Sequence, residues 1–344
     1  MTDIFDDTTQ FLSNLGWSGF YDDQLAADEI SLARMRIATV HRSRMTAQSQ
    51  AGPVKLMLPP QSKTMDYAVG DWVLVEHLTH MLVRRLERQS LLQRRSEDVR
   101  NRQLIAANVD TLFIVTSCND DFNPARLERY LALANEAGTT PVILLTKVDQ
   151  ASDAKSYHQQ ATQLQRGLAV VMLNAKDPQA AQILAPWCRA GQTIALVGSS
   201  GVGKSTLLNT LSAKHLEDAQ SVGSIRTHDA KGRHTTTSRS LHAIAGGGWV
   251  IDTPGMRTLN VSDVASGLDM LFAEITELAP ACRFRDCTHA HEPGCAVQKA
   301  VAEGTIDPDR LSRWRKLIDE NRDKTPTETG PRGNKTPQKR SKRR

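Results

Sequence analysis

The most constraining feature of this chain is a glycine-rich segment that follows, rather than precedes, the motifs that would work with it. Residues 198–206 fit the phosphate-binding pattern G-x-x-x-x-G-K-[ST]. Two short polar motifs, 146–149 and 174–176, come before it, and an Asp-x-x-Gly motif, 252–255, comes after it. The usual order of a GTP-binding domain puts the phosphate loop first and the base-reading motifs last. The rotated order therefore predicts a nucleotide hydrolase with a circularly permuted domain.

The phosphate loop is predicted to join a buried strand, 193–197, to a helix over 204–211. Its glycines let backbone N–H groups turn toward phosphates, and the helix N-terminus adds its positive end. Lys204 would reach the β- and γ-phosphates, and the Ser205 hydroxyl would bind Mg²⁺. A chance match is the alternative, and the flanking strand and helix argue against it. The residues assigned to the loop are Gly198, Ser199, Ser200, Gly201, Val202, Gly203, Lys204, Ser205 and Thr206.

A second acidic position is predicted beside the phosphates. Asp252 follows an apolar strand, 249–251, where an acid can hold Mg²⁺ through water. Gly255 would free a backbone N–H for the γ-phosphate. Taken alone, Asp-x-x-Gly is more typical of a plain turn. Its place about fifty residues after a phosphate loop favours the nucleotide role.

The stretch between these motifs offers candidates for the remaining tasks. A hydroxyl of Thr235 or Thr236 could complete the Mg²⁺ shell, and we assign Thr236, although a threonine run is also typical of an ordinary loop or the start of a strand. Met256 occupies the place after Gly255 where many GTPases carry a glutamine, and an apolar side chain cannot orient water. His234 is a candidate to position the attacking water, with a plain loop histidine as the alternative.

The two upstream motifs are predicted to read guanine. Asp149 could accept hydrogen bonds from the guanine N1–H and the exocyclic amine, a donor pair that adenine lacks. The Lys147 stem would cover one face of the base, and the backbone N–H near Ala175 could meet O6. Asp149 could instead simply begin a helix, but both motifs follow predicted strands, where a doubly wound sheet binds ligands. The assigned residues are Thr146, Lys147, Asp149, Asn174, Ala175 and Lys176.

The fold class is predicted to be multidomain. Short strands with turns before residue 105 suggest a small β-barrel, and from Val109 buried strands alternate with helices, as in a mostly parallel P-loop sheet. The C-terminal region is helical around a cysteine cluster. The expected parts are a poorly ordered or peripheral arm over 1–30, a barrel over 31–105, a GTPase domain over 106–262, a zinc-binding helical domain over 263–323, and a disordered basic tail over 324–344.

Several basic and aromatic residues are candidates for binding nucleic acid. The arginine-rich stretch 84–102 is either a solvated connector or a phosphate-contacting surface. The basic tail is typical of nucleic-acid binding or of no specific partner. Only Trp72, and with it Tyr67, are rings that the barrel could offer for stacking, so base-specific readout is expected to be limited. No apolar run is long enough for a membrane span, and the N-terminus is acidic rather than signal-like, so a cytoplasmic location is expected.

A compact group of cysteines and histidines is predicted to bind metal. Three thiolates and one imidazole make a closed tetrahedral Zn²⁺ site, which is structural rather than catalytic. His291 is a competing imidazole, and unligated buried cysteines are the alternative to a metal. Cys118 and Cys188 stand apart and are expected in the core. The assigned ligands are Cys282, Cys287, His289 and Cys295.

These residues resemble the RsgA (YjeQ) family of circularly permuted GTPases, most specifically over 103–110, 232–237 and 282–295. The resemblance implies an N-terminal OB-fold, a permuted G domain and a C-terminal zinc domain with His289 as the histidine ligand. It also implies a role in late maturation of the bacterial small ribosomal subunit, with ribosomal RNA as partner. Thr146 replaces the commoner asparagine of the first base motif, and Asn174 replaces the commoner serine of the second.

Three functions compete. The first is a GTPase, expected to be a monomer, that turns over slowly alone and faster on the small ribosomal subunit. The second is a P-loop kinase or ATPase acting on a small molecule, which predicts adenine preference and leaves the cysteine cluster and the barrel unexplained. The third is a non-catalytic RNA-binding zinc protein with a vestigial loop, against which the intact Lys204, Ser205 and Asp252 argue.

Overall fold

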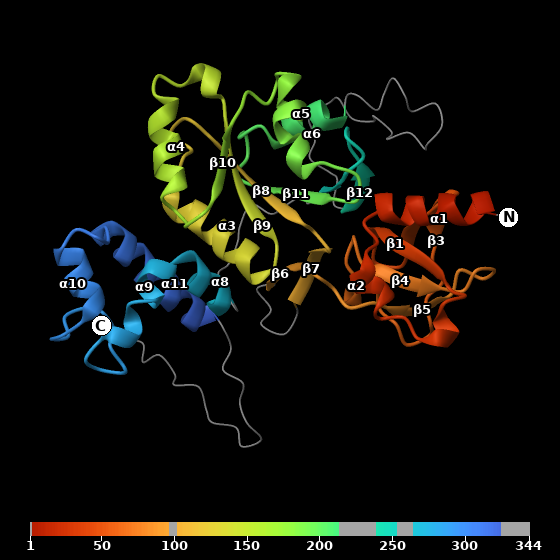
Figure 1. The fold of residues 1–344 in the computed structure, drawn as a ribbon, viewed down its shortest axis with the longest axis horizontal. Helices are drawn as coiled ribbons and strands as arrows, with labels where there is room; N and C mark the ends of the chain where they lie inside the picture. The colour runs from red at the N-terminus through yellow and green to blue at the C-terminus, as the bar shows by residue number, and fades with distance from the viewer. Residues whose placement is uncertain (1, 96–101, 213–238, 253–263, 325–344) are drawn as a thin grey trace, which may run out of the picture.

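The computed structural model describes residues 2–95, 102–212, 239–252 and 264–324. Figure 1 shows a barrel of short strands at one end, a central sheet with helices, and a helical part at the opposite end. The N-terminus lies beside the barrel, and the described chain ends in the helical part. None of the helices in these ranges is long and apolar enough to cross a membrane.

The N-terminal segment is more than a peripheral arm. It forms two helices, α1 (Thr2–Asn14) and α2 (Gly19–Asp22). Leu15 and Tyr21 are 0% and 1% exposed, so both belong to the core. The expectation of a poorly ordered or peripheral arm is therefore wrong for this part of the segment, because its apolar side chains find partners that lie far away in the sequence.

Trp72 is a core residue rather than a stacking platform. Its ring is 1% exposed. The ring of Trp17 packs edge-on against it with centroids 4.9 Å apart, and the ring of Tyr21 lies 5.7 Å away. Tyr67 is half-buried and packs against the apolar interior of the barrel. Trp72 is therefore not available for stacking on bases, since no face of the ring is open.

Five short strands form the barrel. They are β1 (Ala33–Val40), β2 (Met45–Ser49), β3 (Gly52–Lys55), β4 (Trp72–Val75) and β5 (Leu82–Arg85). Around the barrel their order is β3-β2-β1-β4-β5, and the bridge between Met57 and Met81 closes the gap from β5 back to β3. This is the five-stranded, partly open arrangement of an OB-fold, as the resemblance implied. Its interior is filled by Met35, Ile37, Met45, Ala47, Leu56, Val73, Val75 and Leu82.

The arginine-rich stretch begins with structural ion pairs. Arg84 lies 2.6 Å from the Glu29 carboxylate, and Arg88 lies 2.6 Å from the carboxylate of the buried Asp71. These two arginines are therefore neither a solvated connector nor a free phosphate-contacting surface. The stretch continues through a hairpin of β6 (Leu91–Arg95) and β7 (Arg102–Ala107), and residues 96–101 lie outside the described part.

The central sheet is built mostly from parallel strands, in the order β10-β9-β8-β11-β13. Its strands are β8 (Thr111–Ser117), β9 (Thr140–Thr146), β10 (Ala169–Met172), β11 (Thr193–Val197), β13 (Trp249–Asp252) and the antiparallel β12 (Ser240–Ala243). Its helices are α3 (Pro124–Glu136), α4 (Ala154–Thr162), α5 (Gln179–Leu184) and α6 (Lys204–Ser212). Alternate residues of β8 pack into two different cores: Leu112 and Ile114 into one, Phe113 and Val115 into the other. The sheet is thus covered on both faces, which explains its unbroken apolar strands.

The sheet does not stop at the domain boundary. Thr39 of β1 pairs with Ser240 of β12, so the barrel strands and the central strands form one eleven-stranded sheet. The sequence gives no sign of this pairing, because β1 and β12 are far apart along the chain. Short 3₁₀ helices connect the larger elements at Ala27–Glu29, Thr64–Asp66, Val148–Gln150, Ala185–Trp187 and Ala279–Ala281.

The C-terminal part contains α8 (Ala265–Leu271), α9 (Ala273–Thr276), α10 (Ala296–Ala302) and α11 (Pro308–Lys324). Helix α8 lies directly on α3, and only a glycine fits at the crossing. A Cβ on Gly267 would stand 2.1 Å from the Ala132 carbonyl oxygen, and the Gly267 N–H donates to Glu136 at 2.8 Å. The helical part is therefore packed closely against the central domain.

Candidate nucleotide site and metal centre

The phosphate loop lies between β11 and α6, as the sequence predicts. Gly198 has φ +141°, and a Cβ there would stand 2.1 Å from the Val115 carbonyl oxygen. Gly203 has φ +99°. Larger residues would strain or block the loop at both positions. The loop thus brings backbone N–H groups and the start of a helix to one place, which is the arrangement that binds phosphate.

Lys204 folds back over the loop. Its Nζ donates to the carbonyl oxygens of Gly198, at 2.7 Å, and of Ser199. Ser205 is exposed in the first turn of α6, and Thr206 is half-buried. The lysine therefore already stands at the mouth of the loop, and Ser205 presents its hydroxyl to solvent, where a cation could reach it.

Asp252 ends β13 next to the loop. Because Ile251 pairs with Ala195 in the parallel neighbour β11, Asp252 comes level with the last residues of that strand. Burial raises the pKa of the Asp252 carboxyl, and the nearby His242 opposes the shift. A carboxylate that is partly desolvated in this way gains from a nearby cation.

Two residues near Asp252, Ser240 and His242, were not predicted from the sequence to belong to the site. Ser240 pairs directly with Asp252 across the β12–β13 ladder, and the Ser240 Oγ lies 2.6 Å from the His242 Nε2. Burial lowers the pKa of His242, and Asp252 opposes that shift. Period-two alternation along β12 would place residues 240 and 242 on one face, but only the register of the ladder shows that this face meets Asp252.

Thr146 ties the first base motif to the phosphate loop. Its side chain is 0% exposed, and its Oγ1 donates to the Val202 carbonyl oxygen at 2.6 Å. Position 146 thus holds a hydroxyl that bridges β9 and the loop. After it, Lys147 adopts the left-handed conformation with φ +56°, and the chain turns into the 3₁₀ helix that carries the exposed Asp149.

The second base motif also contacts the phosphate loop and its helix. A Cβ added to Gly203 would stand 3.5 Å from the Ala175 side chain, and the Ala175 carbonyl oxygen accepts a 2.7 Å hydrogen bond from Thr210 of α6. The Asn174 Oδ1 accepts from the Lys176 N–H at 3.0 Å, which fixes the turn. The structure therefore brings Thr146 of the first motif and Ala175 of the second into contact with the phosphate loop and its helix.

Gly255, His234, Thr235 and Thr236 lie outside the described residues, as does Met256.

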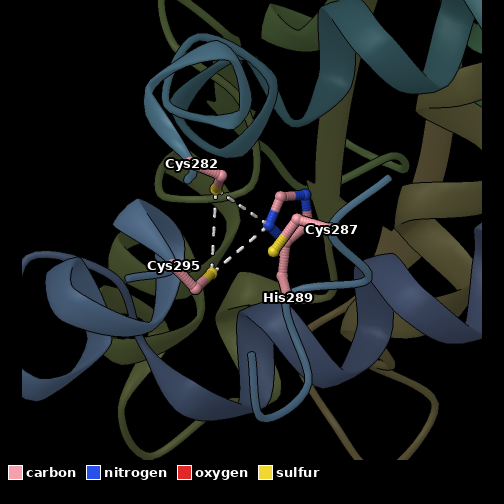
Figure 2. A group of neighbouring side chains, drawn as sticks. All are labelled: Cys282, Cys287, His289 and Cys295. Carbon is pink, nitrogen blue, oxygen red and sulfur yellow. Dashed lines mark hydrogen bonds between the residues drawn. The ribbon is translucent and has the colours of Figure 1, made fainter. Parts of the chain in front are cut away.

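The four predicted metal ligands meet in the C-terminal part (Figure 2). Their ligand atoms all lie within 4.8 Å of one another. The sulfurs of Cys282 and Cys295 are 3.8 Å apart, and the Nδ1 of His289 lies 3.5 Å from the first and 3.4 Å from the second. The competing His291 is exposed, whereas His289 is 5% exposed.

These distances fit a zinc ion. With Zn–S near 2.3 Å and Zn–N near 2.0–2.1 Å, a tetrahedral ion holds two sulfurs roughly 3.8 Å apart and a sulfur and a nitrogen roughly 3.5 Å apart. The backbone N–H of Ala296 donates to the Cys282 sulfur at 3.4 Å, and that of Gln298 donates to the Cys295 sulfur at 3.3 Å. Such donors stabilise thiolates, which is the ligand form that zinc needs.

Hydrogen bonds and a ring contact hold the loop that carries the metal ligands. Glu292 accepts hydrogen bonds from Thr288 and from the backbone N–H groups of Ala290 and His291. Hydrogen bonds from Thr288 lower the pKa of Glu292, so it stays ionised. The His289 ring packs on Trp314 of α11, with centroids 5.5 Å apart.

Cys118 and Cys188 are buried away from this cluster, as expected, at 4% and 1% exposed. Burial raises the pKa of Cys188 to about 12. Burial also raises the pKa of Cys118, so both stay neutral thiols.

A phosphate loop in a mostly parallel sheet, with base motifs on strands that precede it in the chain, defines a circularly permuted P-loop GTPase. Among solved structures, YloQ, described as a circularly permuted GTPase, shares this fold with a TM-score of 0.61 at 24% identity, covering 88% of this chain and 99% of that one. YjeQ of Thermotoga maritima matches with a TM-score of 0.60 at 25% identity, over 83% and 97%.

The chain belongs to the RsgA GTPase family, whose model matches residues 85–262. It is 67% identical over 333 residues to the small ribosomal subunit biogenesis GTPase RsgA of Mesorhizobium japonicum, covering 97% of this chain and 96% of that one. It is 47% identical over 311 residues to RsgA 2 of Vibrio vulnificus, covering 90% and 87%. The resemblance found in the sequence is thereby confirmed, and the protein is a GTP hydrolase.

Proposed function

We propose that this GTPase acts on the small ribosomal subunit as a late assembly factor, and that the bound subunit accelerates its turnover. The observation that carries the proposal is the 67% identity, over almost the full length of both chains, to a protein named for biogenesis of that subunit. A protein with this task works where ribosomes are assembled, which is the cytoplasm, and we take one chain on one subunit as the working unit.

At the nucleotide site, each residue has a proposed task. Lys204 leaves the loop carbonyls and turns its Nζ to the β- and γ-phosphates, while backbone N–H groups of 198–206 hold the same oxygens. Mg²⁺, when bound, neutralises charge on the phosphates. Ser205 would hold it directly and Asp252 through water, a donor set of oxygens that suits this ion. Asp149, Lys147 and the backbone near Ala175 would read guanine.

Slow turnover by the free protein is part of the proposal. Met256 cannot orient water, so attack on the γ-phosphate depends on other groups, among which His234 is our candidate. Thr236, or Thr235 in its place, would close the Mg²⁺ shell. We propose that binding to the subunit orders these residues and thereby raises the rate.

The partner surface is proposed to be basic and to contact RNA phosphates. In the barrel, the turn between β1 and β2 carries the exposed Arg42 and Arg44, and an open groove beside it is lined by Arg42, Lys63 and Thr64. The Thr64 hydroxyl donates to the Arg42 carbonyl oxygen at 3.0 Å, which joins the turn to the groove. Contacts of this kind weaken steeply as salt rises.

Hydrolysis of GTP and ATP, each with and without purified small subunits, tests the proposed function. We expect hydrolysis of GTP but not of ATP, and a rise of at least about tenfold in GTP turnover when subunits are added, because ordered switch residues stabilise the transition state. Equal use of ATP would favour the small-molecule kinase or ATPase instead. GTP turnover that subunits leave unchanged would contradict the ribosomal role.

Metal content gives a separate prediction. We expect about one zinc per purified chain, because three cysteine sulfurs and an imidazole nitrogen lie within 4.8 Å of one another, a donor set that zinc prefers. Replacing Cys295 with Ser should reduce the bound zinc to about a tenth and loosen α10, whose first turn packs on the site. The measurement is elemental analysis together with proteolysis of residues 264–324. His291→Ala is the matched control and should keep its zinc; zinc far below one per chain in the parent would rule the site out.

A further inference from the structure

One barrel strand, β1, pairs both with other strands of the barrel and with a strand of the central sheet. Along its first half it pairs with β4, and along its second half with β2, which is the ordinary OB arrangement. Beyond the β4 contact, Thr39 pairs with Ser240 of β12, a strand of the central sheet. The barrel and the GTPase sheet are thus joined by backbone pairing, not by side-chain contact alone.

Strand β12, which pairs with β1, also pairs with the strand that ends in Asp252. Ser240 stands opposite Thr39 on one side and opposite Asp252 on the other, so the three residues form one row across three strands. Neighbouring strands lie about 4.8 Å apart, which puts the Thr39 backbone roughly 10 Å from that of Asp252. The C-terminal end of β1 therefore lies near the end of the central strands that carries the phosphate loop.

Without β1, β12 would be an edge strand. Within the described residues it has only β13 and β1 as neighbours, and it is four residues long. Short edge strands are weakly held. Since the ladder between β12 and β13 carries Ser240 and His242 against Asp252, anything that fixes β12 also fixes the surroundings of that carboxylate.

Arg36 anchors β1 to the strand that carries the phosphate loop. Its guanidinium is fully buried and donates to Thr193 Oγ1 of β11 at 2.8 Å, to the Leu15 oxygen at 2.7 Å and to the Asn108 oxygen at 2.8 Å. Its Nε donates to the Gly70 oxygen at 3.2 Å. The strand is therefore tied to β11 through Arg36 near its middle and to β12 near its C-terminal end.

We propose that β1 is a structural part of the GTPase centre, in which Val40 is a positioning residue whose backbone holds β12 and, through Ser240, the Asp252 carboxylate. Val40 acts through β12 rather than on nucleotide or metal directly. It keeps the Mg²⁺ side of the site at a fixed distance from the phosphate loop. The inference depends on the proposed role of Asp252 beside the Mg²⁺ and not on the ribosomal role.

Two adjacent proline substitutions separate this role from general damage to the barrel. The His41 N–H donates to the Arg44 oxygen, on the β2 side. Because N–H groups alternate in direction along a strand, the Val40 N–H points to β12 and the Thr39 N–H to β2. Val40→Pro therefore removes a donor toward the GTPase sheet, and Thr39→Pro, the matched control, removes one toward the barrel.

We expect Val40→Pro to lower kcat for GTP about tenfold with KM changed less than twofold, and Thr39→Pro to change kcat less than threefold. Binding of a fluorescent GDP should show the cause independently of turnover. Val40→Pro should keep the parent affinity in EDTA and lose most of the gain in affinity that Mg²⁺ provides. Equal kcat losses in both variants, or an unchanged kcat in a folded Val40→Pro, would overturn the proposal.

If the proline variants do not fold, an engineered disulfide between β1 and β12 tests the same proposal. Thr39→Cys with Ser240→Cys places two thiols on directly opposed residues, within reach of a disulfide. After oxidation with oxidised glutathione, with zinc content checked, turnover should stay within twofold of the reduced form. A tenfold loss on locking would show that the pair must open, which contradicts a fixed positioning role. Asp252→Ala with full turnover would instead remove the proposed role of Asp252 itself.

Discussion

Replacing Lys204 with Ala is expected to lower kcat for GTP by at least about a hundredfold. The Nζ of this residue is the one cation that the phosphate loop itself supplies, and it already sits over the loop, bonded to the Gly198 oxygen at 2.7 Å. In the transition state, charge spreads over the transferred phosphoryl group, and a positioned donor there is worth roughly a factor of 10² to 10³ in rate. The fold should survive, because the lysine is half-buried and its hydrogen bonds to Gly198 and Ser199 hold only the loop itself.

Steady-state GTP hydrolysis and binding of a fluorescent GDP measure the effect. Lys155→Ala is the matched control, since Lys155 is an exposed lysine of the same domain, on α4. The control should keep kcat within twofold. Turnover by Lys204→Ala within tenfold of the parent would mean that the loop does not serve the γ-phosphate, and the proposed chemistry would have to be abandoned.

The second large effect is expected on stability. Glu128 of α3 is 0% exposed and accepts hydrogen bonds from Arg310 at 2.7 Å and from Arg313 at 2.8 Å, both on α11. Arg310 also donates to Glu274 at 2.8 Å and lies over the Phe272 ring at 4.0 Å. Glu128→Ala would remove the fully buried carboxylate that Arg310 and Arg313 share. Breaking a buried pair in this way typically lowers the free energy of unfolding by about 3–5 kcal/mol.

Urea unfolding followed by circular dichroism measures this loss. The matched control is Glu277→Ala, which removes an ion pair between the same two parts of the chain. Glu277 lies 3.0 Å from Arg166, but both side chains are more than half exposed. Its loss should therefore lower the free energy of unfolding by at most about 1 kcal/mol. Similar losses in the two variants would show that the buried network does not hold α11 on α3.

Much of the site could be read from the sequence, because phosphate and metal chemistry demand fixed residue types at fixed spacings. The loop at 198–206 needs its glycines to turn N–H groups inward, and the structure shows φ +141° at Gly198 and +99° at Gly203. The cysteine cluster needs four soft donors on a short stretch, and these donors meet within 4.8 Å. In both cases the partners are near neighbours along the chain.

Sequence reasoning failed where a residue's role depends on distant partners. Trp72 looked like a stacking ring, yet Trp17 and Tyr21 of the N-terminal segment cover it. Arg84 and Arg88 looked like part of a charged surface, yet Glu29 and Asp71 bind them. Burial and ion pairing are decided by what the fold brings up to a side chain, and residue type alone does not reveal it.

The amino-acid order by itself determined the chemistry of this protein: a rotated set of nucleotide motifs and a compact set of metal ligands, each defined by local spacing. Only the tertiary structure decided how the parts are joined. The pairing of Thr39 with Ser240, the burial of Arg36 among four segments and the contact of α3 with α11 each link residues remote in the chain. Backbone pairing does not require particular residue types, since almost any side chain can occupy a strand. The sequence therefore does not predict that the barrel strands continue the GTPase sheet.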